Sequence, residues 1–298
     1  MYLTRVNKYK NKLKQLGGVI PQVGYATNIG GRAYQEDRIY TLSGKVGGEE
    51  YVILSVFDGH GGAETSEYLS NLPFRCKTVL NNIQVPLTPQ IISTIINIEF
   101  TKIDYENTPE MRKPFTGSTA VMCFIFDTHI YVANIADSPA ILFDRNGAII
   151  QKTNIHDCNN PLEITRINSD FNVPQCENTG VSNRLSLGVL PSGNYDRGLD
   201  MTRAFGDNAY KPKSNAVPEI QVWERTPGQI LCICSDSFLD MKLNFSAYKQ
   251  NEQDIVNEVL PVLQANNFNP QISVDAIVTR RATSIPNSDN TSMILAIL

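Results

Sequence analysis

The chain has 298 residues, of which 42% are hydrophobic, and its 26 basic and 30 acidic side chains give a net charge of −4. This size and composition predict a globular protein with a buried core rather than a disordered, collagen-like or coiled-coil one. Because the balance is acidic, we expect no nucleic-acid partner. Because no window approaches 18 uninterrupted apolar residues, we expect no transmembrane segment.

The first sixteen residues are basic. They hold five Lys or Arg and no acid, which leaves a net charge of −9 on the rest of the chain. Such an arm could contact an acidic partner or a membrane surface, but a solvated terminus is the simpler interpretation. We therefore expect an arm over 1–20 and a single domain over 21–298. No apolar segment near the N-terminus resembles a signal peptide, so we expect an intracellular protein, cytoplasmic or nuclear.

Residues 51–57 are a short apolar run that predicts a buried strand ending in a glycine turn. Isoleucines at helical spacing predict an amphipathic helix over 88–105. Four β-rich runs between 118 and 150, separated by turn residues, predict an antiparallel meander. The polar stretch 154–200 is rich in Pro, Gly and Asn, which indicates a loop-rich insertion.

The last third of the chain predicts strands at 219–224 and 229–235, two helices around 255–263 and 270–282, and a final strand at 292–298. This order lacks regular βαβ alternation, which predicts an α+β fold built of layers. The six cysteines are scattered and form no C-x-x-C pair. Without a secretory signal we expect them to be free thiols: Cys76, Cys123, Cys158, Cys176, Cys232 and Cys234.

Acidic residues stand at the ends of several predicted strands. A single aspartate there is usually a turn or cap residue, but strand ends bring distant side chains together on a rigid frame. A cluster of carboxylates suits Mg²⁺ or Mn²⁺, and two such ions could clamp a phosphoryl group for in-line attack. The candidates are Glu36, Asp37, Asp58, Asp137, Asp236, Asp240 and Asp289.

Three residues beside these carboxylates fit the same chemistry. Gly59 lets the backbone approach an ion closely. His60 has an unperturbed pKa near 6.5, which suits proton donation to a leaving alkoxide. Arg32 could bind phosphate oxygens bidentately. Each also has a plain structural alternative, as a turn residue or a surface charge.

Seven motifs in this order resemble the metal-dependent serine/threonine protein phosphatases of type 2C. They lie at 31–37 (GRAYQED), 56–62 (VFDGHGG), 116–120 (TGSTA), 132–138 (VANIADS), 202–207 (TRAFGD), 235–240 (SDSFLD) and 289–292 (DNTS). The resemblance covers about residues 22–298. It implies a central β-sandwich of two antiparallel sheets flanked by helix pairs, with a flap over about 155–200 that shapes substrate access.

The resemblance also implies the roles of single residues. It matches Glu36, Asp58, Asp236 and Asp289 to carboxylate ligands of two Mg²⁺ or Mn²⁺ ions, and Gly59 to a carbonyl ligand. Arg32 matches the phosphate-binding arginine and His60 the general acid, while Asp37 and Asn290 match polar groups around the metal-bound waters. A third, weakly bound ion is implied at Asp137 and Asp236, with Asp240 close by.

The implied activity is hydrolysis of phosphoserine and phosphothreonine in proteins, by attack of a metal-bridging hydroxide, by a monomer. Three positions depart from the family pattern: Ala136 and Ser237 stand where Gly is usual, and Pro139 where Arg is usual. If Ser237 occupies a glycine conformation, we expect strain of order 1–3 kcal/mol there. These departures leave a catalytically weak or silent regulatory protein of the same fold as the alternative.

Other chemistries fit less well. A cysteine phosphatase needs an arginine six residues after its cysteine, and no cysteine here has one. A calcineurin-like metallophosphoesterase would need more histidine ligands than the three present. A two-metal nuclease would need a basic surface.

Overall fold

The computed structural model describes residues 20–298 except 86, 107, 170–173, 179–182, 191, 195, 244–245, 250 and 285–287, and over 240–249 it describes no side chains. The predicted arm over 1–20 therefore lies outside the described residues, apart from Ile20. No helix of the described part is long and apolar enough to cross a bilayer.

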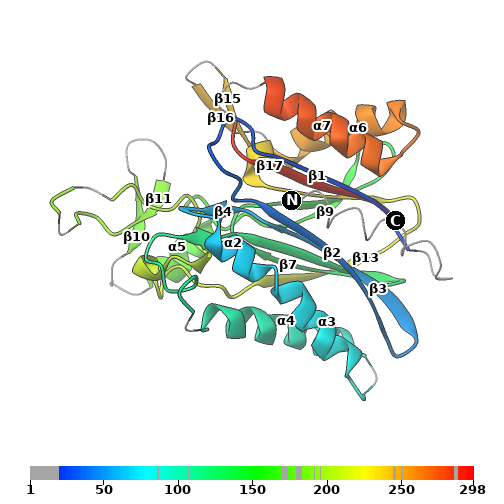
Figure 1. The fold of residues 1–298 in the computed structure, drawn as a ribbon, viewed down its shortest axis with the longest axis horizontal. Helices are drawn as coiled ribbons and strands as arrows, with labels where there is room; N and C mark the ends of the chain where they lie inside the picture. Colours follow the sequence, from blue (N-terminus) through cyan, green and yellow to red (C-terminus); the bar gives the residue numbers. More distant parts are fainter. Residues whose placement is uncertain are drawn as a thin grey trace.

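Two five-stranded antiparallel sheets stack face to face (Figure 1). The first sheet has the order β13-β7-β6-β3-β2, with bounds Glu219–Glu224, His129–Ile135, Ala120–Ile125, Glu49–Phe57 and Arg38–Val46. The second has the order β1-β17-β14-β8-β9, with bounds Gln22–Asn28, Thr291–Ile297, Ile230–Cys234, Ala140–Phe143 and Ile149–Lys152.

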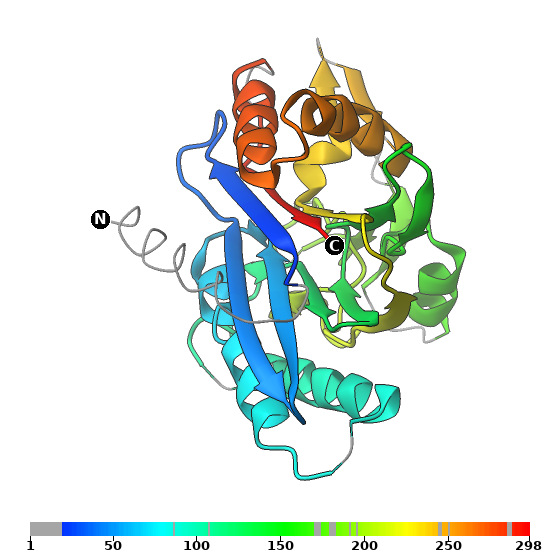
Figure 2. The ribbon, with the colours of Figure 1, turned by 90° about the vertical axis from the view of Figure 1, so that its right-hand side faces the viewer.

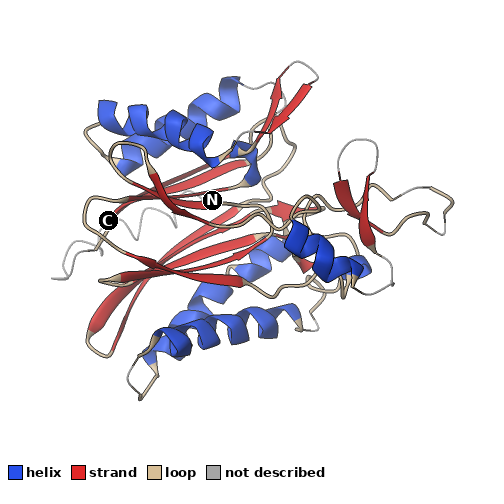
Figure 3. Cartoon of the chain, turned by 180° about the vertical axis from the view of Figure 1, so that it is seen from behind, coloured by secondary structure: helices blue, strands red, loops and turns tan. Residues whose placement is uncertain are grey.

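A pair of helices covers the outer face of each sheet (Figures 1 and 3). Helices α3 (Leu72–Asn81) and α4 (Pro89–Asp104) pack on the first sheet, and α6 (Glu252–Ala265) and α7 (Pro270–Ser284) on the second. Figure 2 shows the four layers turned by 90°. The fold class is therefore the one predicted, an α+β sandwich flanked by helix pairs.

The apolar run of β3 shows why the central strands have apolar side chains at consecutive positions. Leu54 and Val56 point between the two sheets, whereas Ile53 and Phe57 point to the α3–α4 layer. Because both faces are buried, both faces of the strand must be apolar. Each large side chain buried this way contributes about 1.5–3 kcal/mol.

The predicted helix over 88–105 is confirmed as α4. Pro89 occupies its first turn, and the Thr88 side chain accepts a hydrogen bond from the Ile91 backbone N–H at 3.3 Å. A proline lacks the N–H that would be unsatisfied there, so this start suits the helix. The remaining predicted strands and helices of the last third are confirmed as β13, β14, α6, α7 and β17.

The predicted single meander over 118–150 is wrong. Strands β6 and β7 pair in the first sheet, whereas β8 and β9 pair in the second. Residues 136–139 carry the chain across, and the Pro139 carbonyl accepts a hydrogen bond from Cys234 N–H of β14 at 3.1 Å. Strands β6, β7 and β8 are all buried and mainly apolar, so their sequences do not indicate which sheet each one joins.

The insertion over 154–200 contains short elements as well as loops. They are helix α5 (Pro161–Asn168) and a hairpin of β10 (Gln175–Asn178) and β11 (Asn183–Ser186), which project from one end of the sandwich (Figure 1). Here the prediction of free cysteines is wrong for two residues, because Cys158 and Cys176 form a disulfide. The other four cysteines are buried free thiols. Helix α5 lies between the two cysteines in the sequence, and cysteine spacing alone does not reveal that they meet.

Candidate functional site

The predicted site residues collect at one end of the sandwich. Asp58 follows β3, Asp137 follows β7 and Asp236 follows β14, whereas Asp37 precedes β2 and Asp289 precedes β17. The start of one strand lies beside the end of its antiparallel neighbour, so these residues lie at the same end of the sandwich. Asp240 begins β15 (Asp240–Leu243), but its side chain lies outside the described residues.

Asp58 is the centre of the carboxylate cluster. Burial raises its pKa well above the usual value, and the negative charges of Asp37, Asp236 and Asp137 raise it further. The Asp236 backbone N–H donates to the Asp58 carboxylate at 3.4 Å. Four carboxylates thus share one small region, so in the ionised state each destabilises the others.

Asp37 lies in the same cluster and is 3% exposed. Burial raises its pKa to about 6, and the charge of Asp289 adds to the rise. The Ser235 and Ser292 hydroxyls offset part of this, but both Asp37 carboxylate oxygens are buried without a hydrogen bond of ordinary geometry. A buried acceptor without a donor is costly, and a cation would relieve that cost.

The donor set therefore fits hard divalent cations, which prefer carboxylate and carbonyl oxygens. Within the described residues, no three acidic, imidazole or thiol groups are already spaced to hold a metal ion. Some of these side chains would have to move to complete a metal site. One such side chain is Asp289, which forms an ion pair with Arg32.

Gly59 follows Asp58 directly and lies on the two-residue strand β4 (Gly59–His60). A Cβ at this position would lie 2.7 Å from both the Glu36 carbonyl oxygen and the Ser66 hydroxyl. Only glycine allows this close approach of three chain segments. Glu36 is held beside it, since its carboxylate accepts the Gly62 N–H at 2.6 Å.

His60 is paired with Asp207, an aspartate for which the sequence alone predicts no role. Its Nε2 lies 2.6 Å from the Oδ2 atom of Asp207, a fully buried residue. Burial alone would lower the pKa of His60, but the Asp207 carboxylate raises it above the ordinary value. Asp207 ends the motif at 202–207, so the motif was visible, but its pairing with a residue 147 positions away was not.

Gly117 leaves the room for this pair. It lies opposite His60 in the pairing of β4 with β5 (Gly117–Ser118). A Cβ on Gly117 would lie 2.1 Å from the Asp207 carboxylate and 2.6 Å from His60 Nε2. The glycine of the motif at 116–120 is therefore required by the histidine–aspartate contact.

Asn290 holds the loop that carries Arg32 and Glu36. Its side-chain oxygen accepts the Glu36 N–H at 2.7 Å, and its amide donates to the carbonyls of Ile29 at 2.9 Å and Tyr34 at 3.2 Å. Its polar atoms thus position the loop. Arg32 stays half-exposed at the mouth of the site.

Two of the departures from the family pattern have different structural outcomes. Ala136 has a φ of +77°, the left-handed region that favours glycine and that costs an L-residue about 1–2 kcal/mol. Its backbone is held by His156, whose N–H donates to the Ala136 carbonyl at 3.0 Å and whose Nδ1 accepts the Ala136 N–H at 3.2 Å. Ser237 instead lies in a 3₁₀ turn over Asp236–Phe238, so the strain expected there is absent.

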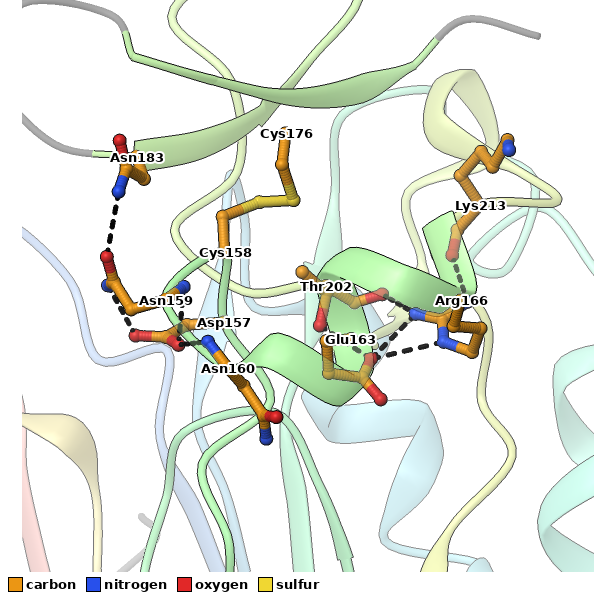
Figure 4. Close-up of a disulfide and its surroundings, with 10 residues drawn as sticks. All are labelled: Asp157, Cys158, Asn159, Asn160, Glu163, Arg166, Cys176, Asn183, Thr202 and Lys213. Atoms are coloured by element: carbon orange, nitrogen blue, oxygen red, sulfur yellow. Dashed lines mark hydrogen bonds and ion pairs between the residues drawn. A yellow bond between two sulfur atoms is a disulfide. The ribbon is translucent and has the colours of Figure 1, made fainter. Parts of the chain in front are cut away.

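Glu163 of α5 joins the insertion to the segment that follows it, at Thr202 and Arg203; Figure 4 shows it beside Arg166 and Thr202. It is 2% exposed and accepts hydrogen bonds from Arg166 at 2.7 Å, Arg203 at 2.5 Å and Thr202 at 2.8 Å. Burial raises its pKa, but the two arginines outweigh burial and hold it at about 2. The ionised carboxylate is therefore a stabilising part of the fold.

We expect Glu163→Gln to lower the free energy of unfolding by about 3 kcal/mol at pH 7. The folded pKa of about 2 lies below the ordinary 4.5. The contribution is therefore complete above pH 4.5 and is lost as the pH falls towards 2. Urea unfolding of both proteins at pH 7 and pH 3 measures it, with the exposed Glu224→Gln as control. The difference in free energy of unfolding between the two proteins should shrink by more than half at pH 3. Equal differences at both pH values would contradict the stabilising role of the ionised Glu163 carboxylate.

Comparisons with known proteins agree with this architecture. A model of the family described as "Protein phosphatase 2C" matches residues 36–261. Probable protein phosphatase 2C 55 of Oryza sativa subsp. japonica is 30% identical over 231 residues, which cover 75% of this chain and 55% of that protein. Probable protein phosphatase 2C 11 of Arabidopsis thaliana is 29% identical over 226 residues, which cover 75% and 56%. The chain thus spans about half the length of these curated relatives.

Solved structures share the fold. The serine-threonine phosphatase 2C from Toxoplasma gondii aligns with a TM-score of 0.69 and 19% identity over 94% of this chain and 96% of that one. The serine/threonine phosphatase of Mycobacterium tuberculosis aligns with a TM-score of 0.55 and 17% identity, over 94% and 99%. Because the family model matches well over half of the sequence, the chain belongs to the protein phosphatase 2C family.

Proposed function

We propose that the chain is a metal-dependent protein serine/threonine phosphatase, with residues 21–298 as one catalytic domain and the insertion over about 155–200 as its flap. The observation that carries the proposal is the buried carboxylate cluster around Asp58, beside a hydrogen-bonded His60 and a half-exposed Arg32. Phosphoserine and phosphothreonine in proteins are the proposed substrates.

The cluster would hold two Mg²⁺ or Mn²⁺ ions. Glu36, Asp58, Asp236 and Asp289 would supply carboxylate oxygens, and Gly59 a carbonyl oxygen. Asp37 would accept hydrogen bonds within the cluster, and Asp137 with Asp236 and Asp240 would hold a weaker third ion. When bound, the ions would neutralise phosphate charge and lower the pKa of water.

Arg32 would bind the phosphate oxygens of the substrate. In this structure its guanidinium pairs with Asp289. If Asp289 turns towards the carboxylate cluster, the guanidinium is left free at the mouth of the site. There it would orient the phosphate and stabilise the charge that its equatorial oxygens carry during in-line displacement.

His60 would give a proton to the serine or threonine oxygen as it leaves. Since Nε2 is hydrogen-bonded to Asp207, we assign the transferred proton to Nδ1. Nδ1 is buried and has no hydrogen-bond partner, so no other group holds its proton, and a movement of the ring or of its neighbours would have to bring it to the leaving group. Asp207 would keep the ring oriented and stabilise its protonated form.

Hydrolysis of a phosphothreonine peptide and of p-nitrophenyl phosphate with Mn²⁺, with Mg²⁺ and with EDTA tests the proposal. We expect turnover with either ion and none with EDTA, and no turnover by Asp236→Asn under any of these conditions. Calorimetry measures binding of Mn²⁺ separately. Binding of Mn²⁺ without turnover would instead support a silent regulatory protein of the same fold.

A further inference from the structure

The flap packs around a small hydrophobic core, to which Tyr210 of the segment after the flap also contributes. Cys158, Ile167, Leu185 and Tyr210 are buried there, and the partly exposed Cys176 packs against them. The disulfide joins the residue three positions before α5 to strand β10, with a Cα–Cα distance of 5.5 Å (Figure 4). One covalent bond thus fastens the β10–β11 hairpin to the start of α5.

The contacts around Cys158 make its segment rigid. The Asp157 carboxylate accepts the backbone N–H groups of Asn159 at 2.9 Å and Asn160 at 3.1 Å. The Asn160 side chain in turn caps α5 through Leu162 N–H at 3.0 Å. Only one side-chain hydrogen bond drawn in Figure 4 reaches the hairpin from this segment, from Asn183 to Asn159 at 2.9 Å. The disulfide is therefore the strongest connection between the two.

This flap core adjoins both sides of the proposed catalytic site. Two residues before Cys158, His156 holds the left-handed Ala136, which precedes Asp137. On the other side, the Tyr210 backbone N–H donates to the carbonyl of Asp207 at 2.9 Å, and Asp207 orients His60. A loss of order in the flap core would therefore disturb both the His156–Ala136 contact and the Tyr210–Asp207 contact.

The two cysteines of the disulfide differ in exposure to solvent. Cys158 is 1% exposed, whereas Cys176 is partly exposed. The four free cysteines are all buried in the layers of the sandwich. Cys176 is therefore the cysteine that an external thiolate can approach from solvent, whereas Cys158 is buried in the flap and the other four are buried in the sandwich.

We propose that Cys158–Cys176 is a reversible thiol–disulfide exchange site that controls the order of the flap. The thiolate of an external dithiol attacks the Cys176 sulfur and forms a mixed disulfide, and Cys158 leaves as a thiolate that takes up a proton. The second thiolate of the dithiol then attacks the dithiol sulfur that is bonded to Cys176. The dithiol closes to a disulfide, and Cys176 is released as a thiolate that takes up a proton. The disulfide gains two electrons and two protons, and the dithiol becomes a disulfide. A small-molecule disulfide such as oxidised glutathione reverses the reaction.

Thiol counting in denaturant tests the bond itself. We expect four reactive thiols per chain after treatment with oxidised glutathione and six after dithiothreitol, with peptide mapping placing the change at Cys158 and Cys176. Re-oxidation should restore four. Six thiols after oxidised glutathione, or a bond that dithiothreitol opens only in denaturant, would overturn the proposal.

Limited proteolysis tests the consequence for the flap and is independent of the proposed function. We expect cleavage within 159–200 to be on the order of 10- to 100-fold faster in reduced protein. Cys176→Ser should be cleaved at the fast rate with or without dithiothreitol, which makes it the control for the other thiols. Equal cleavage rates of oxidised and reduced protein would overturn the proposal, even if Cys176→Ser does not fold.

An activity measurement tests whether the disulfide affects the proposed catalytic site. This experiment rests on the proposed function. Reduction should raise the KM for a phosphothreonine peptide severalfold and change that for p-nitrophenyl phosphate less, because only the peptide is large enough to contact the flap. If the protein proves to have no phosphatase activity, the thiol count and the cleavage rates still decide whether the exchange site exists. An unchanged peptide KM in an active enzyme would overturn its role in controlling the site.

Discussion

Asp58→Asn is expected to lower metal-dependent turnover on the order of 10³-fold or more, because it removes a charge from the centre of the carboxylate cluster. Lewis-acid catalysis supplies several kcal/mol of transition-state stabilisation, and each 1.36 kcal/mol is a factor of ten in rate. Steady-state hydrolysis of p-nitrophenyl phosphate over a range of Mn²⁺ concentrations measures the loss. Asparagine has nearly the same size, so a loss at every metal concentration would reflect charge rather than packing.

The same substitution should stabilise the metal-free protein. Burial and the charges of Asp37, Asp236 and Asp137 raise the pKa of Asp58, so ionised Asp58 destabilises the fold at neutral pH. We expect a higher melting temperature for Asp58→Asn at pH 7 in EDTA, with a gain that disappears on acidification below the ordinary aspartate pKa of 3.8, where Asp58 is protonated in both the folded and the unfolded protein.

The matched control is Asp275→Asn, an exposed aspartate of α7, the helix that covers the second sheet. It should change neither turnover nor melting temperature. Full metal-dependent activity of Asp58→Asn would refute the assignment of the cluster. A lower melting temperature would show that Asp58 has stabilising partners in the metal-free protein.

His60→Gln is expected to slow hydrolysis of a phosphoserine peptide by about 10²- to 10⁴-fold, the usual contribution of a general acid. A serine alkoxide is a poor leaving group and needs the proton, whereas nitrophenolate leaves without one. p-Nitrophenyl phosphate should therefore be affected much less. Parallel kcat measurements on both substrates check this split, and an equal loss on both would contradict the acid role.

Asp207→Asn should also slow hydrolysis of the peptide more than hydrolysis of p-nitrophenyl phosphate. The loss on the peptide should be smaller, about 10- to 100-fold, because Asp207 acts through the orientation of His60. Gly117→Ala should reproduce it, since the added methyl group would lie 2.1 Å from the Asp207 carboxylate and 2.6 Å from His60. Asp275→Asn again serves as control. If Asp207→Asn lowered turnover of both substrates equally, Asp207 would have only a structural role.

Much of the fold and the site could be predicted from the sequence because the signals are local. The apolar run before Asp58 indicates a strand buried on both faces, and the period of the isoleucines in 88–105 indicates one buried helix face. Motif spacing then places the carboxylates at strand ends. The family resemblance, rather than any local signal, then predicted that the carboxylates at 37, 58, 137 and 236 lie together at one end of the sandwich, with Asp289 beside them.

The tertiary structure alone decided which distant groups meet. Nothing local indicates that residues 136–139 pass between the sheets, that Asp207 accepts a hydrogen bond from His60, that Arg32 pairs with Asp289, or that Cys158 joins Cys176. Each of these contacts depends on the path of the chain between the partners. Periodicity and propensity describe the environment of a residue along its own element, whereas the identity of a partner from another element is set only when the layers pack together.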